Sequence, residues 1–240
     1  MFNINYIIPF VCFWQTISTE ISKYKPVTVS ANICNFLNSI FFIVHHHYNY
    51  NLDYVTHISI GFYTYDLLYM FSYIYKANAN ANANANANAN ANKEFKRHLP
   101  YILHHLAGIY LLHEALTGDI KEHLLNGYNI LETSNIMLYI SYHLHKEYAN
   151  YMYLNIISEF IQLIWYSYYR IVYFSLYIYK IKSDILQVCL TTQCFIFAVF
   201  CMGVAWSYKL SKKNVKNFNA LKDQYGNEYG PSITPDSKLN

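Results

Sequence analysis

The chain has 240 residues, of which 54% are hydrophobic and only 13% are charged. A soluble globular domain carries about 25% charged residues, so the composition argues against an ordinary soluble protein and favours a membrane protein. The net charge of +3 is too small to indicate a nucleic acid as partner.

Mean hydropathy is only +0.07, which is low for a membrane protein. The 27 Tyr and 11 His residues lower it, together with many Asn. Because Tyr, Asn, Ile, Lys and Phe have A/T-rich codons, we interpret much of this excess as genomic bias. The succession of apolar segments is therefore a better guide to the fold than the average.

Seven apolar segments follow one another along the chain. They cover residues 4–21, 31–47, 54–75, 99–116, 124–142, 151–179 and 185–210. About 17–25 helical residues at 1.5 Å each span the hydrocarbon core of roughly 30 Å, and a helix satisfies its own backbone polar groups in lipid. We therefore predict an all-α, multi-pass transmembrane helical bundle. Pro9 interrupts the first segment, so the bundle has six or seven spans.

Polar and low-complexity stretches divide this bundle into regions. Residues 1–30 hold the first span and its loop, and residues 31–210 form the main membrane domain. Within that domain, residues 77–92 are Ala-Asn dipeptides, which we interpret as a disordered loop without chemistry. Residues 211–240 contain Gly, Pro, Ser and charged residues, and we predict that they form a disordered cytosolic tail.

Basic residues are unevenly divided between the two sides of the predicted bundle. With the N-terminus outside, the cytosolic side receives Lys23, Lys25, Lys76, Lys93, Lys96, Arg97, Lys146, Lys209, Lys212, Lys213 and Lys216. The opposite side receives only Lys121, Lys180 and Lys182. Positive charge favours the cytosolic face, so we predict a cytosolic C-terminus, which favours an odd number of spans.

Several spans carry ionisable or strongly polar side chains. They are Asp66 in the third span, His104, His105, His113 and Glu114 in the fourth, Glu132, Ser134 and Asn135 in the fifth, and Arg170 in the sixth. A charged residue at bilayer depth costs about 2.5–3.5 kcal/mol on insertion scales. We therefore predict that these side chains line a cavity, or that they hold the helices together by hydrogen bonds. For Arg170, we expect a structural pairing with Asp66 or Glu159.

The order of these motifs resembles the TLC-domain family, whose membrane domain is shared by ceramide synthases and translocating-chain-associated membrane proteins. The resemblance covers about residues 31–210 and rests on GFYTYD ending at Asp66, the His104-His105 pair, the ETSN cluster starting at Glu132, Arg170 and Trp206. It implies a bundle around a lipid-accessible cavity, a role in membrane lipid homeostasis, and a place in the endoplasmic reticulum.

Ceramide synthases of this family carry a double His followed by a His-Asp and a further Asp. His104 and His105 match the double His, and Glu132 stands at the first Asp. Leu131 replaces the adjoining His, and Asn135 stands at the second Asp. The chain is therefore more similar to the family members that are not ceramide synthases.

The resemblance leaves three functions open. The first is binding, sensing or moving a membrane lipid, with no cofactor. The second is an N-acyltransferase similar to ceramide synthase, which joins acyl-CoA and a sphingoid base. In that reaction His104, His105 and Glu132 would be catalytic, the histidines as base or nucleophile and the carboxylate as the group that orients them. The third is a non-enzymatic partner of other membrane proteins.

Depth in the membrane favours one contact among the candidate residues. At 1.5 Å per residue, His105 lies about 9 Å from one end of its span, and Glu132 lies about 12 Å from the opposite end of the next. These depths leave them roughly 9 Å apart along the normal of a 30 Å core, so we expect His113 rather than His105 to contact Glu132. The histidines lack the spacing of a di-metal box, and we predict no metal site.

Overall fold

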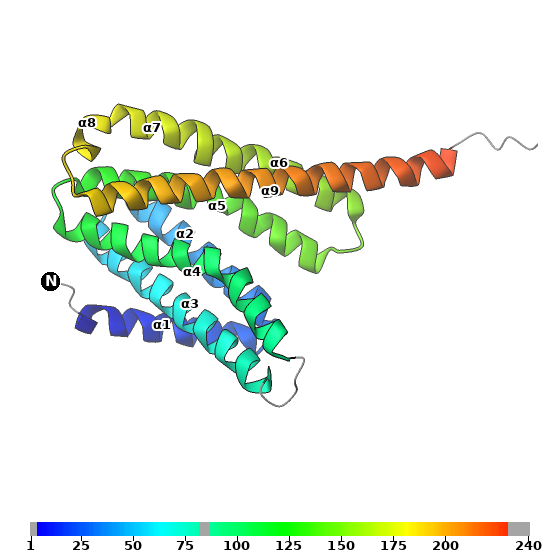
Figure 1. The fold of residues 1–240 in the computed structure, drawn as a ribbon, viewed down its shortest axis with the longest axis horizontal. Coiled ribbons are helices and arrows are strands. Elements are labelled where there is room, and N and C mark those ends of the chain that lie inside the picture. Colours follow the sequence, from blue (N-terminus) through cyan, green and yellow to red (C-terminus); the bar gives the residue numbers. More distant parts are fainter. Residues whose placement is uncertain (1–3, 82–86, 230–240) are drawn as a thin grey trace, which may run out of the picture.

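The computed structural model of the chain describes residues 4–81 and 87–229, and every regular element within them is helical (Figure 1). The elements are α1 (Ile4–Ser22), α2 (Val27–His47), α3 (Leu52–Ala81), α4 (Ala87–Thr117), α5 (Lys121–Glu147), α6 (Met152–Ser167), η1 (Tyr168–Tyr173), α7 (Phe174–Lys180), α8 (Lys182–Ile185) and α9 (Leu190–Tyr229). α6, the π-helical turn η1 and α7 follow one another without a break and form one rod. The prediction of an all-α fold is confirmed.

Six long helical segments enclose the interior of the bundle. Around the ring, α3 packs on α4, α4 on α9, α9 on α6 and η1, α6 on α5, α5 on α2, and α2 on α3. α4 also packs on α5 across the ring, and α1 lies outside it against α2 and α3 (Figure 1). Trp14 anchors α1, because its indole N–H donates to the backbone carbonyl of Ile58 at 3.1 Å in the core.

Ion pairs between turns fix which helix ends lie together. At one end of the bundle, the Lys25 ammonium before α2 lies 2.7 Å from the Glu147 carboxylate at the end of α5. At the other end, Lys121 at the start of α5 pairs with Asp53 at the start of α3. Helices that follow one another along the chain therefore run in alternating directions in this part of the bundle.

The helices extend further than the predicted apolar segments. α3 continues to Ala81 and α4 begins at Ala87, so parts of the Ala-Asn repeat are helical and not a loop. α9 continues to Tyr229, so the first part of the predicted disordered tail is also helical. Alanine favours helix strongly, and a helix that has already formed adds residues at little cost. The rest of both predicted segments lies outside the described residues.

The bundle buries many polar side chains beside its apolar core, and it exposes many large apolar side chains. Its buried polar side chains include Ser30, Asn38, Ser39, Thr56, Ser59, His105, Glu132, Ser134, Asn135, Ser158, Glu159, Gln162, Arg170, Thr192 and Ser207. Its exposed large apolar side chains form outward faces, which on α6 comprise Leu154, Ile157, Phe160, Ile161 and Ile164. A helix of a soluble bundle shows the opposite pattern, with its apolar stripe facing the core.

Two of the described stretches are long and apolar enough to cross a membrane, Thr28–His47 and Leu190–Lys222. Only 33% and 28% of their most apolar windows are buried inside the protein, so most of each stretch faces outward. This finding supports membrane association, and it does not by itself support six or seven spans.

Candidate functional site

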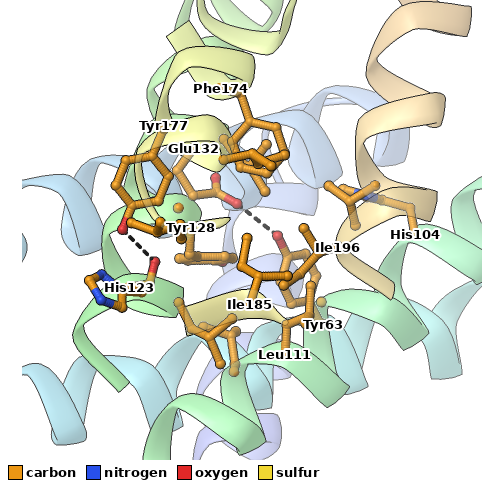
Figure 2. Close-up of a pocket in the computed structure, with 18 residues that line it drawn as sticks. Tyr63, His104, Leu111, His123, Tyr128, Glu132, Phe174, Tyr177, Ile185 and Ile196 are labelled. Atoms are coloured by element: carbon orange, nitrogen blue, oxygen red, sulfur yellow. Dashed lines mark hydrogen bonds between the residues drawn. The ribbon is translucent and has the colours of Figure 1, made fainter. Parts of the chain in front are cut away.

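An enclosed pocket lies inside the ring, between α3, α4, α5, α7, α8 and α9 (Figure 2). Its wall is formed by Tyr63, His104, Gly108, Leu111, Leu112, His123, Leu124, Gly127, Tyr128, Leu131, Glu132, Phe174, Tyr177, Ile178, Ile181, Ile185, Ile196 and Val199. The volume of the pocket that the centre of a water molecule can occupy is about 50 Å³. Since one water needs roughly 10–15 Å³ of such space, the pocket has room for the end of a slender chain and not for a bulky headgroup.

A wider groove continues from the pocket to the side of the bundle, between α7–α8 and α9. The pocket and the groove share Ile178, Ile185 and Ile196. Further out, the groove is lined by Leu190 and Phe197, both of which are exposed on the outer surface. The pocket therefore adjoins a groove that opens on the apolar side of the protein.

One buried polar group at the pocket wall is centred on Glu132 of α5, which is 2% exposed. The Tyr63 hydroxyl of α3 donates to Oε1 of Glu132 at 2.7 Å, and the Ser39 hydroxyl of α2 donates to Oε2. Beside them, the Asn38 amide donates to the Tyr128 hydroxyl at 3.5 Å. These five residues are named the Glu132 cluster. Both carboxylate oxygens have protein donors, and the cluster joins α2, α3 and α5.

The two adjacent histidines of α4 have different surroundings. His105 is buried, and its Nε2 lies 2.9 Å from Oδ2 of Asp66 on α3. His104 instead lines the pocket, and its ring centroid lies 5.3 Å from that of Trp206 on α9. Successive residues of a helix point about 100° apart, so the structure brings only one of the pair to the pocket.

A second buried polar group is centred on Arg170, which is 1% exposed. Its Nε donates to Oγ of Ser134 at 2.7 Å, and its Nη2 donates to Oδ1 of Asn135 at 3.1 Å. Among the described residues, its Nη1 has no hydrogen-bond partner, and neither have the buried hydroxyls of Tyr166 and Ser207. These five residues are named the Arg170 cluster. The hydrogen-bonded partners of the Arg170 guanidinium are neutral, and part of its hydrogen-bonding capacity is unused.

The backbone around Arg170 is shaped for this inward position. The π-helical turn Tyr168–Tyr173 interrupts the rod, and such turns within α-helices are frequent at functional sites. On the facing helix α9, a Cβ at Gly203 would lie 3.3 Å from the Arg170 Cβ. Glycine at this position therefore allows α9 to pack directly on the stem of the arginine.

The structure places the nine predicted site residues in several locations. His104 and Glu132 lie at the pocket wall. Ser134, Asn135 and Arg170 meet in the Arg170 cluster, and Asp66 and His105 pair with each other. His113 and Glu114 lie on α4 outside the wall. The predicted trio of His104, His105 and Glu132 is therefore split, because His105 is turned toward α3.

The expected contact between His113 and Glu132 is not the one that the structure forms. The Glu132 oxygens accept hydrogen bonds from Tyr63 and Ser39 instead. α4 and α5 are joined by a short turn at 118–120, so residues equally far from that turn lie at the same level. His105 and Glu132 are nearly equidistant from the turn and therefore lie at similar levels. The predicted depths differed because each was counted from the end of its own apolar segment and not from the turn.

Arg170 also pairs with neither of the two acids expected for it. Asp66 lies beside His105, and the Glu159 carboxylate lies 2.7 Å from the Lys213 ammonium. The arginine is held by neutral groups on the adjacent helix α5, two and three residues beyond Glu132. Its two predicted partners are thus engaged by side chains of other helices, His105 of α4 and Lys213 of α9.

Tyr63, Tyr166 and Ser207 are absent from the predicted site. The interpretation of the Tyr excess as codon bias hides Tyr63, whereas Tyr166 recurs with Glu159 and Arg170 at helical spacing on one face of its segment. Tyr63 lies three residues before Asp66, and Tyr166 lies four residues before Arg170. These spacings place each tyrosine on the same helix face as its charged neighbour, and they are the signal by which sequence reasoning finds them.

Comparisons with protein-family models, curated proteins and solved structures return no match. The resemblance to the TLC-domain family therefore stays a prediction, and the functional argument depends on the fold and the site. In the part of the chain that the structure describes, no three His, Cys, Asp or Glu side chains gather in a way that could hold a metal ion.

Proposed function

We propose that the protein is a multi-pass integral membrane protein that binds the hydrocarbon chain of a membrane lipid in the pocket of Figure 2. The observation that carries this proposal is the pocket wall, which is mostly apolar and continues into a groove at the side of the bundle. Pre-formed apolar pockets with a few placed polar groups are typical of small-molecule sites. A lipid chain that enters by the groove exchanges one apolar environment for another.

The outer surface supports a membrane location for more helices than the two of highest hydropathy. Exposed apolar side chains cover α6 as well as parts of α2, α3, α4 and α9. The shortest of the long helices, α1, has 19 residues, or about 28 Å at 1.5 Å each, which approaches the roughly 30 Å of a hydrocarbon core. We propose seven spans, or six if α1, which lies outside the ring, does not cross.

The distribution of basic residues supports a cytosolic C-terminus, and the TLC resemblance supports the endoplasmic reticulum. This orientation places the turn at 118–120 in the lumen and the turn at 148–151 in the cytosol. An Asn-X-Thr acceptor inserted at the first turn should become glycosylated in microsomes, and one inserted at the second should not. The reverse pattern would contradict the orientation, and glycosylation of both would contradict a span between them.

A pocket-filling substitution tests lipid binding. A Cβ at Gly127 would lie 3.6 Å from Phe174 and 3.7 Å from Tyr177 ring atoms, so Gly127→Leu fills the pocket from an ordinary starting contact. Ala205→Leu, on the exposed side of α9, is the matched control. Lipids extracted from the purified proteins and identified by mass spectrometry should include a species that is about tenfold depleted in Gly127→Leu alone.

Equal amounts of every lipid in the wild type and Gly127→Leu would contradict binding in this pocket. Equal depletion in Ala205→Leu would show instead that the outer surface holds the lipid. The comparison requires that both variants elute from size exclusion as the wild type does.

A second candidate is acyl-CoA-dependent N-acyl transfer, and one observation favours it: the imidazole of His104 lines the same pocket. In this reaction a neutral imidazole accepts the proton of a sphingoid amine while the amine attacks the thioester carbonyl of acyl-CoA. The thioester C–S bond then breaks, and CoA leaves as the thiol with the proton that the imidazole returns. Purified protein should then convert a sphingoid base and acyl-CoA to the N-acyl product. His104→Ala should abolish the conversion, whereas His105→Ala should leave part of it. No product from the wild type would remove this candidate.

A further inference from the structure

We propose that the Arg170 cluster binds the carboxylate of a long-chain fatty acid whose chain occupies the adjoining pocket. This inference rests on the proposed function, because the pocket must accept a hydrocarbon chain. It adds the chemical class of the headgroup and the residues that select it.

Three side chains of the cluster have hydrogen-bonding capacity that the described residues leave unused. They are Nη1 of Arg170 and the hydroxyls of Tyr166 and Ser207, and all three atoms are buried. Buried polar groups are paired as a rule, and an unmet buried donor costs about 1–3 kcal/mol. Three such donors in one cluster indicate an acceptor that the protein itself does not supply.

The rod and α9 pack antiparallel with one register along their contact. Arg170 lies against Gly203. Three turns further along, the Asn214 amide donates to the backbone carbonyl of Glu159 at 3.3 Å. Both contacts have the same register: moving one residue forward on α9 corresponds to moving one residue back on the rod.

This register brings the unused groups together. Ser207 is one turn after Gly203 on α9, and Tyr166 is one turn before Arg170 on the rod, so the two residues lie at the same level of the contact. The guanidinium carbon of Arg170 is 5.4 Å from the centroid of the Tyr166 ring. One cation and two hydroxyls are thus gathered within about one helical turn.

The Arg170 cluster lies directly beside the pocket. On the rod, Phe174 of the pocket wall follows Arg170 by one turn, and on α9, Val199 of the wall precedes Gly203 by one turn. On α4, His104 belongs to the wall itself, and Figure 2 shows it at the side of the pocket next to α9. A carboxylate at the cluster therefore places its chain along the pocket, toward the groove between α7–α8 and α9.

Charge and size select a carboxylate. Asp66 and Glu159 are engaged by His105 and Lys213, and no described carboxylate lies within 4.0 Å of the Arg170 guanidinium. An arginine is always charged, and a hydrogen bond from its unused Nη1 to a carboxylate is strengthened by both charges. A phosphate monoester carries about 1.5 to 2 negative charges, which is more than one arginine neutralises.

Equilibrium binding of two matched probes tests the inference. The full chain is placed in nanodiscs of neutral phosphatidylcholine, and tritiated hexadecanoic acid and tritiated hexadecanol are titrated, with binding to empty nanodiscs subtracted. The two probes share one chain and differ in the headgroup. The wild type should bind the acid about tenfold or more tightly than the alcohol, because hydrogen bonds to a charged group are stronger.

Three variants assign the preference to the cluster. Arg170→Gln should bind both probes with the affinity of the alcohol. Tyr166→Phe should weaken the acid about threefold to tenfold and leave the alcohol unchanged, since it removes one hydroxyl and no charge. Lys209→Gln, which removes an exposed cation of α9, should match the wild type.

The outcomes separate the two proposals. If neither probe binds the wild type, the pocket does not take a chain, and both proposals fall. If both probes bind equally, the pocket stands and the carboxylate site is overturned. An acid preference that survives in Arg170→Gln also overturns the site. Where Arg170→Gln does not purify as a folded protein, an unchanged preference in Tyr166→Phe overturns it.

Discussion

The two faces of α5 hold two buried polar clusters that differ in what they leave unused. On one face, both oxygens of Glu132 accept hydrogen bonds from hydroxyls of α2 and α3. On the other, Ser134 and Asn135 accept from Arg170, whose Nη1 has no partner among the described residues. Burial of a charged group therefore does not by itself indicate a binding site. The unused donors around it do, because a folded protein rarely leaves them without an acceptor.

The largest expected effect on stability comes from the Glu132 carboxylate, because both of its oxygens have hydroxyl donors. Glu132→Ala leaves the hydroxyls of Tyr63 and Ser39 buried without their acceptor, and each unmet group costs about 1–3 kcal/mol. We expect a loss of about 2–4 kcal/mol in the free energy of unfolding, measured by titration with sodium dodecyl sulfate in mixed micelles. Glu132→Gln, which keeps one acceptor oxygen, should lose about half as much.

Glu122→Ala is the control, because this exposed glutamate of the same helix should change stability by less than about 0.5 kcal/mol. Similar small losses for Glu132→Ala and Glu122→Ala would break the contrast between the two faces of α5. They would mean that the Glu132 hydrogen bonds contribute little to the folded state.

A smaller effect is expected where α9 packs on the rod. Gly203→Val places a branched side chain against the stem of Arg170, where a Cβ would already lie 3.3 Å from the Arg170 Cβ. Overpacking of this kind costs about 1–3 kcal/mol. The variant should also lose its preference for hexadecanoic acid over hexadecanol, because α9 carries Ser207. A stable variant that keeps the full preference for the acid would show that the site consists of Arg170 and Tyr166 without Ser207.

Sequence reasoning finds the helices better than it finds the contacts. The apolar segments 54–75 and 99–116 lie within α3 and α4, because hydrophobic runs of that length form helices in the absence of strand partners. Their ends are missed, since Ala-rich polar residues continue a helix that has already formed. The side on which His105 points is missed as well, because a sequence does not specify which neighbouring helix each face meets.

The candidate site is predicted in part for the same reason. His104, Glu132 and Arg170 stand out as ionisable groups in apolar segments, and the structure buries or half-buries all three. The hydroxyls that distinguish the two clusters belong to Tyr63 and Tyr166, which look like any other tyrosine in a chain with 27 of them. Only the packing of the helices shows which hydroxyl has an acceptor.

The smallest effect is expected at the exposed pair of Lys25 and Glu147, at the end of the bundle. The hydrogen bond from Lys25 holds the pKa of the Glu147 carboxyl below its ordinary value. Because the folded-state pKa is depressed, the pair stabilises the protein above the ordinary carboxyl pKa, and this stabilisation is lost as pH falls through the folded-state pKa. Lys25→Ala should unfold slightly more easily than the wild type at neutral pH, with the difference vanishing in acid and at high salt. A difference that grows as pH falls would contradict this pairing.

The most direct test compares two buried tyrosines, of which only one has an acceptor for its hydroxyl. The Tyr63 hydroxyl donates to Glu132 at 2.7 Å, whereas the Tyr166 hydroxyl has no partner among the described residues. The free energy of unfolding is measured for Tyr63→Phe and Tyr166→Phe, without and with saturating hexadecanoic acid. Without the acid, Tyr63→Phe should lose about 1–3 kcal/mol and Tyr166→Phe should lose nothing. With it, Tyr63→Phe should gain as much stability as the wild type does, and Tyr166→Phe should gain clearly less. Equal losses without the acid, or an undiminished gain in Tyr166→Phe, would contradict the assignment of the two clusters.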